Sequence, residues 1–117
     1  MAASTPHIQV EIFDEGTVVS FVDERIVEES LIEAIGQQLL NLVEKQGHTN
    51  LVLDFSKVKF LASAMLAKLF TLRRRVDQAK GKIHLCGIDR DLRVVFKFAP
   101  KGAFEIFDDE QDALEAF

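Results

Sequence analysis

Two apolar patterns alternate along most of this chain of 117 residues, and the alternation limits the folds that the chain can adopt. Residues 28–46 and 63–79 carry apolar side chains at the three- and four-residue spacing of a helix that is buried on one face. Residues 50–55 and 82–86 are short apolar runs of strand length. Strands that are separated by helices are joined by crossover connections, so the pattern predicts a largely parallel sheet.

The start of the chain follows a different pattern. Residues 7–13 alternate apolar with polar side chains, and residues 17–22 are rich in β-branched side chains, with Asp-Glu-Gly between the two segments. This arrangement predicts an antiparallel hairpin. Residues 1–6 show neither pattern and are predicted to form a flexible tail, so the folded domain is expected to span residues 7–117.

The last third of the chain continues the alternation with shorter elements. A helix is expected to begin at Asp89, and a short strand follows over 104–107. A final helix is expected to open at Asp108, with Gln111 completing a capping box. Its predicted buried residues are Leu114 and Phe117. All the elements together predict a single α/β domain, with a mixed and mostly parallel sheet of about five strands, opened by the hairpin, and about four helices.

The charge and composition argue against two classes of partner. A net charge of -5 and a single basic run, Arg73-Arg74-Arg75, provide no clustered basic surface, so nucleic acid is not an expected partner. No apolar stretch approaches the roughly 18–20 residues of a membrane span, and the first residues do not form a signal peptide. The single cysteine, Cys86, cannot form an internal disulfide. We therefore expect a reduced, cytoplasmic protein that is not attached to a membrane.

The sequence contains no recognisable catalytic or metal-binding motif. His7, His48 and His84 are far apart, with no carboxylate or cysteine at ligand spacing, so each is expected to have a structural role. No glycine-rich phosphate-binding motif occurs, and no G-x-S-x-G surrounds Ser63. We therefore expect neither an enzyme activity nor a bound cofactor or metal.

Ser63 is the one hydroxyl in the apolar stretch 60–66, at the predicted start of a helix. At 100° per residue, one stripe of that helix faces the sheet; it consists of Met65, Leu69, Leu72, Val76 and Ala79. Ser63 lies nearly opposite that stripe. Its neighbours on the outward face and its flank are Leu66, Ala67, Phe70 and Arg74. Two interpretations remain open: a neighbouring helix covers these side chains and Ser63 is a plain N-cap, or they form a partner surface with a modifiable hydroxyl at its edge.

The order of elements and the residues around Ser63 resemble the STAS domain, the family of bacterial anti-sigma factor antagonists. Residues 51–66, LVLDFSKVKFLASAML, are similar to the strand of that family and to the Asp-Ser-Ser-Gly-Leu signature at the start of its next helix. Asp54 falls in that strand, where a polar residue is common. Residues 81–86 and 104–114 also follow the layout of the family.

The resemblance implies a phosphorylation switch. In the family, the first serine of the signature is phosphorylated by a partner kinase that is also the anti-sigma factor. The unmodified antagonist binds that kinase and frees the sigma factor, and phosphorylation breaks the complex. By resemblance, Ser63 is the phosphorylated serine, an anti-sigma serine kinase is the partner, and the binding surface consists of Ser63, Leu66, Ala67, Phe70 and Arg74.

Three positions depart from the family signature. Ala62 replaces the usual aspartate, Ala64 the second serine and Met65 the glycine. The missing acid at Ala62 favours an alternative function, an unmodified scaffold or accessory subunit of a transporter or signalling assembly. A third hypothesis is a small-ligand or nucleotide site near the strand end at Phe55. The sequence makes no prediction of the oligomeric state.

Overall fold

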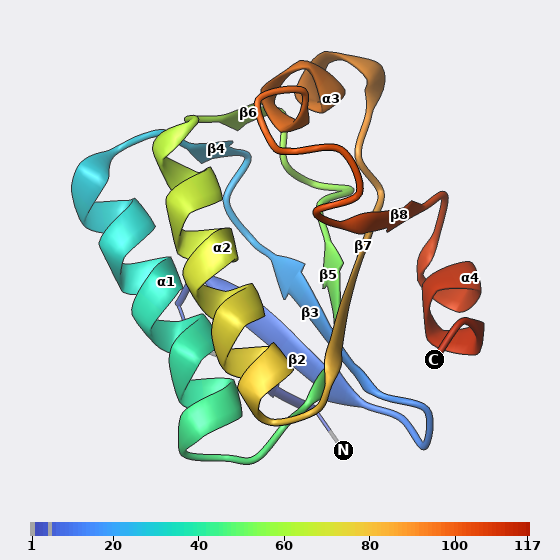
Figure 1. Cartoon of the computed structure of the whole chain (residues 1–117). Coiled ribbons are helices and arrows are strands. Elements are labelled where there is room, and N and C mark those ends of the chain that lie inside the picture. The colour runs from blue at the N-terminus through green and yellow to red at the C-terminus, as the bar shows by residue number, and fades with distance from the viewer. Residues whose placement is uncertain (1, 5) are drawn as a thin grey trace.

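A mixed sheet forms the centre of the molecule (Figure 1). The structure is a computed structural model that describes the backbone of residues 2–4 and the whole of residues 6–117. Within these residues the sheet has six strands in the order β1-β2-β3-β5-β7-β8. In that order the strands are Ala2–Ser4, Ile8–Ile12, Thr17–Phe21, Asn50–Asp54, Lys82–Cys86 and Glu105–Phe107. The first three strands are antiparallel, and each pair from β3 onward is parallel.

The predicted hairpin and the predicted parallel strands are confirmed. In the hairpin, Val10 pairs with Val19, and the amide of Phe13 donates a hydrogen bond of 2.9 Å to the carbonyl oxygen of Gly16 across the turn. Parallel pairing of β3, β5 and β7 requires the crossovers that the alternating pattern indicated. The fold is therefore the expected single α/β domain.

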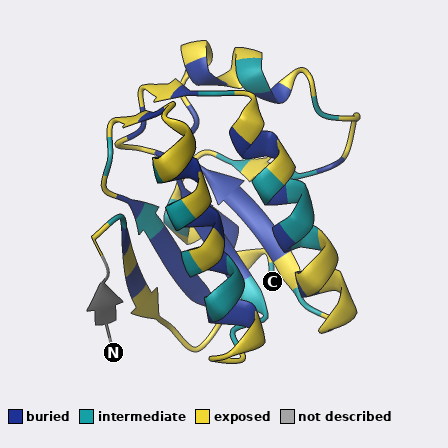
Figure 2. Ribbon diagram, turned by 90° about the vertical axis from the view of Figure 1, so that its left-hand side faces the viewer, coloured by how far each residue is buried: buried dark blue, intermediate teal, exposed yellow. Residues whose placement is uncertain are grey.

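The helices cover the two faces of the sheet unequally. Helices α1 (Glu29–Glu44) and α2 (Ala64–Gln78) pack side by side over one face, whereas the short helix α4 (Glu110–Glu115) lies on the other (Figure 1). Helix α3 (Arg90–Phe96) lies beyond the end of β7, near the N-terminus of α2. Figure 2 shows that the sides of the long helices that face the sheet are buried and that their outer sides are exposed.

The alternation within the strands assigns side chains to the two faces. In β5, Leu51 and Leu53 join the large apolar core under α1 and α2, whereas Val52 belongs to a small cluster under α4. The predicted inward stripe of α2 is confirmed, because Met65, Leu69, Leu72 and Val76 are all fully buried, whereas the fifth member, Ala79, is exposed at the helix end. These contacts fix α2, and therefore Ser63, relative to the sheet.

A second, very small sheet supports the segment before α2. Strand β4 (Arg25–Ile26) pairs in parallel with strand β6 (Phe60–Leu61), and the amide of Ala62 donates to the carbonyl oxygen of Ile26 at 3.0 Å. Two-residue strands carry no periodic pattern, so the sequence did not predict them. They attach the chain just before Ser63 to the end of the hairpin.

The first residues differ from the predicted flexible tail. Ala2–Ser4 forms an edge strand that pairs antiparallel with residues 9–11 of β2. Met1 and Thr5, which also belong to the predicted tail, lie outside the described residues. Backbone pairing along an open sheet edge does not depend on an apolar pattern, so this strand could not be predicted from the spacing of apolar residues.

The predicted capping box of the last helix is wrong. The N-cap is Asp109, whose carboxylate accepts a hydrogen bond from the amide of Asp112 at 2.9 Å. The side chain of Gln111 instead donates to Glu115, one turn later. Two consecutive aspartates can each cap a helix, and the sequence does not show which one does so. None of the helices among the described residues is long and apolar enough to cross a membrane.

Candidate functional site

Ser63 lies at the first turn of α2 with its side chain exposed. Its backbone is helical, with φ -59° and ψ -26°, and its carbonyl oxygen accepts a hydrogen bond of 2.9 Å from the amide of Leu66. Over the described residues, its hydroxyl makes no helix-capping hydrogen bond. Ser63 therefore occupies the predicted N-cap position of α2, but its side chain does not cap the helix, because a capping serine has an extended backbone that directs its oxygen at the free amides.

Fewer apolar side chains are exposed around Ser63 than the sequence predicts. Ala67 and Arg74 are exposed, as expected, but Leu66 is buried, with 5% of its surface exposed. Phe70 is half-buried, because its ring packs 5.3 Å from the ring of Phe104. Leu66 belongs to the large apolar core, whereas Phe70 is covered by the segment before β8. We define the Ser63 face as the exposed residues Ser63, Ala64, Ala67 and Arg74 with the half-buried Phe70.

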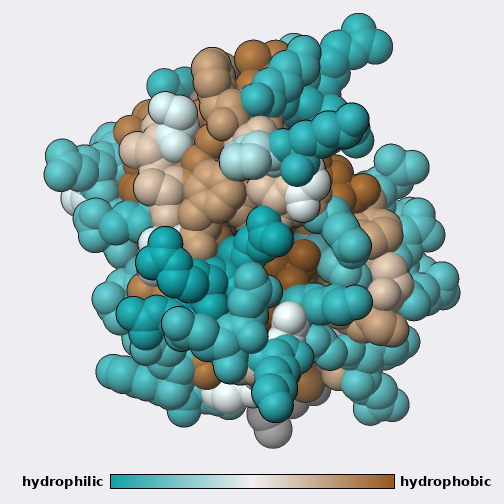
Figure 3. Space-filling model, viewed as in Figure 1, coloured by the Kyte–Doolittle hydropathy of each residue, from teal (hydrophilic) through white to brown (hydrophobic). Residues whose placement is uncertain are grey.

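Figure 3 shows apolar side chains gathered over the N-terminal half of α2 and hydrophilic ones over its C-terminal half. Alanines at positions 64 and 67 leave the backbone of α2 accessible to another molecule. The positive end of the helix dipole lies at the same place. The Ser63 face can therefore present a hydroxyl, an apolar surface and a favourable position for negative charge.

A groove of about 650 Å³ opens beside the segment that leads to Ser63. Phe60 lines it with half of its surface exposed, and the guanidinium of Arg25 lies 4.6 Å from the centre of the Phe60 ring. Other apolar lining residues are Val27, Leu61, Leu92 and Val95. The sequence did not predict this groove, because it exists only where α3 packs beside β4 and β6. An aromatic residue three positions before Ser63 was the one local indication.

Asp54 does not reach the Ser63 face. It follows Val52 on the sheet face that α4 covers, it is 8% exposed, and its carboxylate accepts a hydrogen bond of 2.8 Å from the amide of Ser56. A hydrogen bond to Asp54, together with burial and the charges of Asp54, Glu11 and Asp109, raises the pKa of Glu110 to about 7. The carboxyl group of Glu110 is therefore partly protonated near neutral pH.

Cys86 lies on the same face as Asp54 and is fully buried. Burial, and then the negative charges of Asp54, Glu110 and Asp109, raise the pKa of this thiol to about 12. A thiol with such a pKa is almost entirely protonated at neutral pH and is a poor nucleophile or metal ligand.

The histidines are held by separate local contacts. His7 lies 2.9 Å from a carboxylate oxygen of Asp23, and Nδ1 of His48 lies 3.0 Å from the hydroxyl of Thr17. Among the described residues, no three His, Cys, Asp or Glu side chains converge to hold a metal ion.

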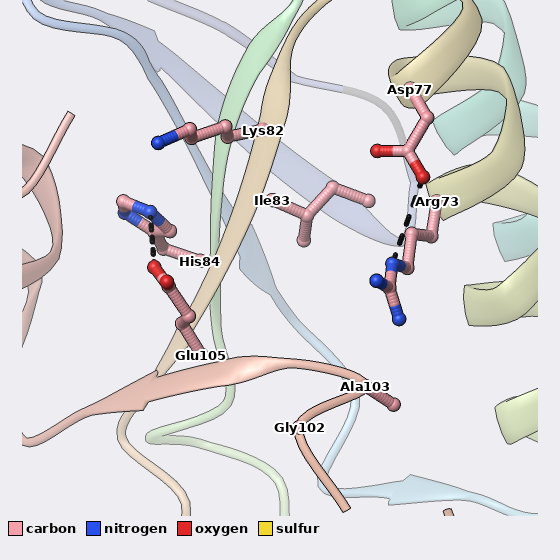
Figure 4. Close-up of a pocket in the computed structure, with 8 residues that line it drawn as sticks. All are labelled: Arg73, Asp77, Lys82, Ile83, His84, Gly102, Ala103 and Glu105. Carbon is pink, nitrogen blue, oxygen red and sulfur yellow. Dashed lines mark ion pairs between the residues drawn. The ribbon is translucent and has the colours of Figure 1, made fainter. Parts of the chain in front are cut away.

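His84 lines a pocket of about 180 Å³ at the edge of β7, shown in Figure 4. Its Nδ1 donates to the carbonyl oxygen of Ala113 at 2.8 Å, and its ring stacks on Phe117 with the centroids 4.1 Å apart. Its Nε2 lies 3.0 Å from a carboxylate oxygen of Glu105, without hydrogen-bond geometry. Arg73 and Asp77 of α2 form the opposite wall. These contacts attach α4 and the chain end to the sheet, which is a structural role.

The model of the STAS domain family matches residues 9–113 of the chain. Similar solved structures include an anti-sigma-factor antagonist (STAS) domain protein from Planctomyces limnophilus. The two share 21% identity over 97% of this chain and 98% of the other, with a TM-score of 0.83. Among curated proteins, none matches the chain.

Two further solved structures share the fold. The phosphorylated form of the Bacillus cell fate determinant SpoIIAA has 19% identity, over 93% of this chain and 97% of that one, with a TM-score of 0.71. A chain from the stressosome, a signal integration and transduction hub, has 18% identity over 92% and 93% of the two chains, with a TM-score of 0.67. Identities this low carry information about the fold alone.

Proposed function

Because the chain belongs to the STAS domain family, we propose that it is an anti-sigma factor antagonist that binds a serine kinase through the Ser63 face and is released when Ser63 is phosphorylated. The proposal rests on the exposure and the hydrogen bonding of Ser63. Its side chain is exposed at the start of α2, and its hydroxyl has no capping role that a phosphate would disrupt. Phosphorylation can then alter binding without unfolding the helix.

The surroundings of Ser63 support a switch that acts at the surface. A phosphate at this position lies at the positive end of the α2 dipole, which stabilises the modified form of the free protein. In a complex, the same phosphate introduces about -1.5 to -2 charges beside the apolar side chains of the Ser63 face. Desolvation and repulsion then oppose docking.

The placement of Asp54 and Glu110 supports a role as a kinase substrate. Asp54 lies under α4 and Glu110 is the first residue of that helix, so both are on the opposite side of the sheet from α2. Neither carboxylate is placed to remove the proton of the Ser63 hydroxyl. We infer that the partner kinase supplies the catalytic base, the nucleotide and the magnesium, and that this chain acts as a binding module without cofactor.

The test is phosphorylation by a candidate anti-sigma serine kinase and ATP, followed by mass analysis of the intact chain and of its peptides. We expect one phosphate on the wild-type chain, on Ser63, and none on Ser63→Ala. Thr71, on the same helix, provides a matched control, because its hydroxyl already donates to the carbonyl oxygen of Ala67. Equal phosphorylation of Ser63→Ala and wild type would exclude the proposal.

The alternative is an unmodified scaffold in a larger assembly. It is favoured by Ala62 and Ala64, which replace the two side chains that flank the modified serine in the family signature. One structural relative belongs to the stressosome. A scaffold would keep its partner affinity in Ser63→Asp, whereas the switch would lose it.

A further inference from the structure

A second exposed surface lies away from Ser63, on α3 and the turn that follows it. Leu92 and Phe96 of this helix are buried, but Val94 and Phe98 point outward, with 53% and 77% of their surfaces exposed. They are four positions apart, so they occupy the same side of the helical segment. Phe98 is a large aromatic side chain with most of its area in water, and together with Val94 it forms an exposed apolar pair.

A preformed groove adjoins these side chains. It has a volume of about 410 Å³, an apolar lining that includes Phe96, Phe104 and Ile106, and Lys97 and Lys101 beside it. The ring of Phe104 lies against Phe70 at 5.3 Å and against Phe96 at 6.4 Å. The lining is therefore fixed by the core, and an occupant would not have to reorganise it.

Two lysines lie at the rim of this groove. Lys97 and Lys101 both line it, and both are exposed. Residues 90–104 contain two arginines, two lysines and one aspartate, so this segment has a net charge of +3 in a chain of net charge -5, although Asp89 and Glu105 on either side of it are acidic. Apolar lining side chains therefore lie beside two lysines, and Figure 3 shows apolar surface beside hydrophilic side chains in this upper part of the molecule.

We propose that this surface docks an acidic protein segment that carries bulky apolar side chains. We call it the α3 groove: its lining includes Phe96, Phe104, Ile106, Lys97 and Lys101, and the exposed Phe98 lies in the chain between two lining residues. Carboxylates of the segment would pair with the lysines, and an apolar side chain would enter the groove near Phe98. This chemistry complements the apolar lining and the two lysines at once. A lipid surface fits less well, because α3 has seven residues, and Val94 on the helix and Phe98 just after it are too few exposed apolar side chains for an interfacial helix.

The α3 groove is distinct from the Ser63 face, although the two share the contact between Phe70 and Phe104. Docking at the groove therefore does not depend on the state of Ser63. A partner that contacts both surfaces would be bound by one constant site and one modifiable site. A test of docking at the α3 groove is therefore independent of whether Ser63 is phosphorylated.

The experiment is a fluorescence-anisotropy titration of the full chain with a labelled synthetic peptide in which Asp and Glu alternate with phenylalanine. Two matched peptides carry Lys in place of the acids or Ala in place of the phenylalanines. We expect saturable binding of the first peptide alone, weakened by added salt. Phe98→Ser and the pair Lys97→Glu with Lys101→Glu should each reduce the affinity by at least about tenfold.

The control is the pair Lys45→Glu with Lys80→Glu, which makes the same charge change at exposed positions near the C-terminal ends of α1 and α2. It should change the affinity by less than about twofold, since charges beyond a Debye length are screened. Ser63→Asp should bind the peptide as wild type does. Circular dichroism of each variant shows that the fold is intact.

Several results would overturn the proposal. The first is an absence of saturable binding, and the second is equal binding of the acidic and basic peptides. The third is an equal loss of peptide affinity in the variant of Lys97 and Lys101 and in the control variant of Lys45 and Lys80. Binding to vesicles of phosphatidylserine and phosphatidylcholine in place of the peptide would assign the surface to a membrane. Sedimentation that shows a dimer abolished by Phe98→Ser would assign it to a second copy of the chain.

Discussion

The two faces of the sheet are built on different principles. Under α1 and α2 lies a large apolar core whose strand residues, such as Leu51 and Leu53, are fully buried. Under α4 lie a few apolar side chains with Asp54 and Cys86, and Glu110 of α4 forms a hydrogen bond with Asp54. The first face gains its stability from apolar area and gives α2 a fixed position, whereas the second depends in part on the protonation of Glu110. The difference shows that one strand can pack against a large apolar core on one face of the sheet and contribute to a contact with a titratable carboxyl group on the other.

The largest expected effect is the loss of an apolar side chain from the first face. Leu69→Ala, in the centre of α2, should lower the free energy of unfolding by about 2–5 kcal/mol, because Leu69 is fully buried and the cavity cannot collapse. Leu114→Ala on α4 is the matched change on the second face. It should cost less, since α4 is short and can shift toward the sheet. Urea unfolding followed by circular dichroism measures both, and equal losses would remove the proposed difference between the faces.

The second effect is a dependence of stability on pH. The pKa of Glu110 is raised from 4.5 to about 7, so between these values the folded chain binds more protons than the unfolded chain. The free energy of unfolding should therefore fall as the pH rises from 4.5 to 7. Glu110→Gln keeps a hydrogen-bonding side chain and should flatten this fall, whereas Glu115→Gln, on the same helix, should not. An unchanged pH profile in Glu110→Gln would show that the carboxyl pair does not control α4.

A smaller effect concerns the reactivity of Cys86. With its pKa raised from 9.0 to about 12, the folded thiol holds ~1000-fold less thiolate than a free one at pH 8. Reaction with a thiol reagent should therefore proceed through opening of α4 and should be faster in Leu114→Ala than in wild type. Rapid labelling of the native wild-type chain, at the rate of the urea-unfolded one, would contradict the buried position of this residue.

The smallest expected effect on stability comes from Ser63→Asp. The side chain is exposed and the new charge lies at the start of α2, so the free energy of unfolding should change by no more than about 0.5 kcal/mol. The same urea titration checks it. A large loss would mean that Ser63 has a structural role, and the surface-switch model would have to be abandoned.

The fold was predictable because its elements are encoded by local spacing. The helix expected over 63–79 and the strand over 82–86 match the structure to within about one residue, since each has one face buried and a clear apolar period. The pairs β4–β6 and β1–β2 were not predictable. Short strands acquire their partners only when distant segments meet.

The candidate site was predictable only in part, because its residues depend on tertiary contacts. The outward direction of Ser63 follows from helical geometry, but the partial burial of Phe70 depends on Phe104, which lies more than thirty residues later in the chain. The raised pKa of Glu110 depends on its hydrogen bond to Asp54, and these two residues lie in elements that are separated by most of the C-terminal half. No local pattern indicates either fact.

The central claim is that a negative charge on the exposed Ser63 weakens partner binding while the fold stays intact. The most direct test is calorimetry at neutral pH, which measures the affinity of an anti-sigma serine kinase for the wild-type chain and for Ser63→Asp. We predict an affinity at least about tenfold lower for Ser63→Asp, since an unpaired charge must be desolvated at the interface. Ser63→Asn, of similar size without the charge, should retain most of the affinity. Equal affinities of wild type and Ser63→Asp for a kinase that binds the wild-type chain would contradict the account.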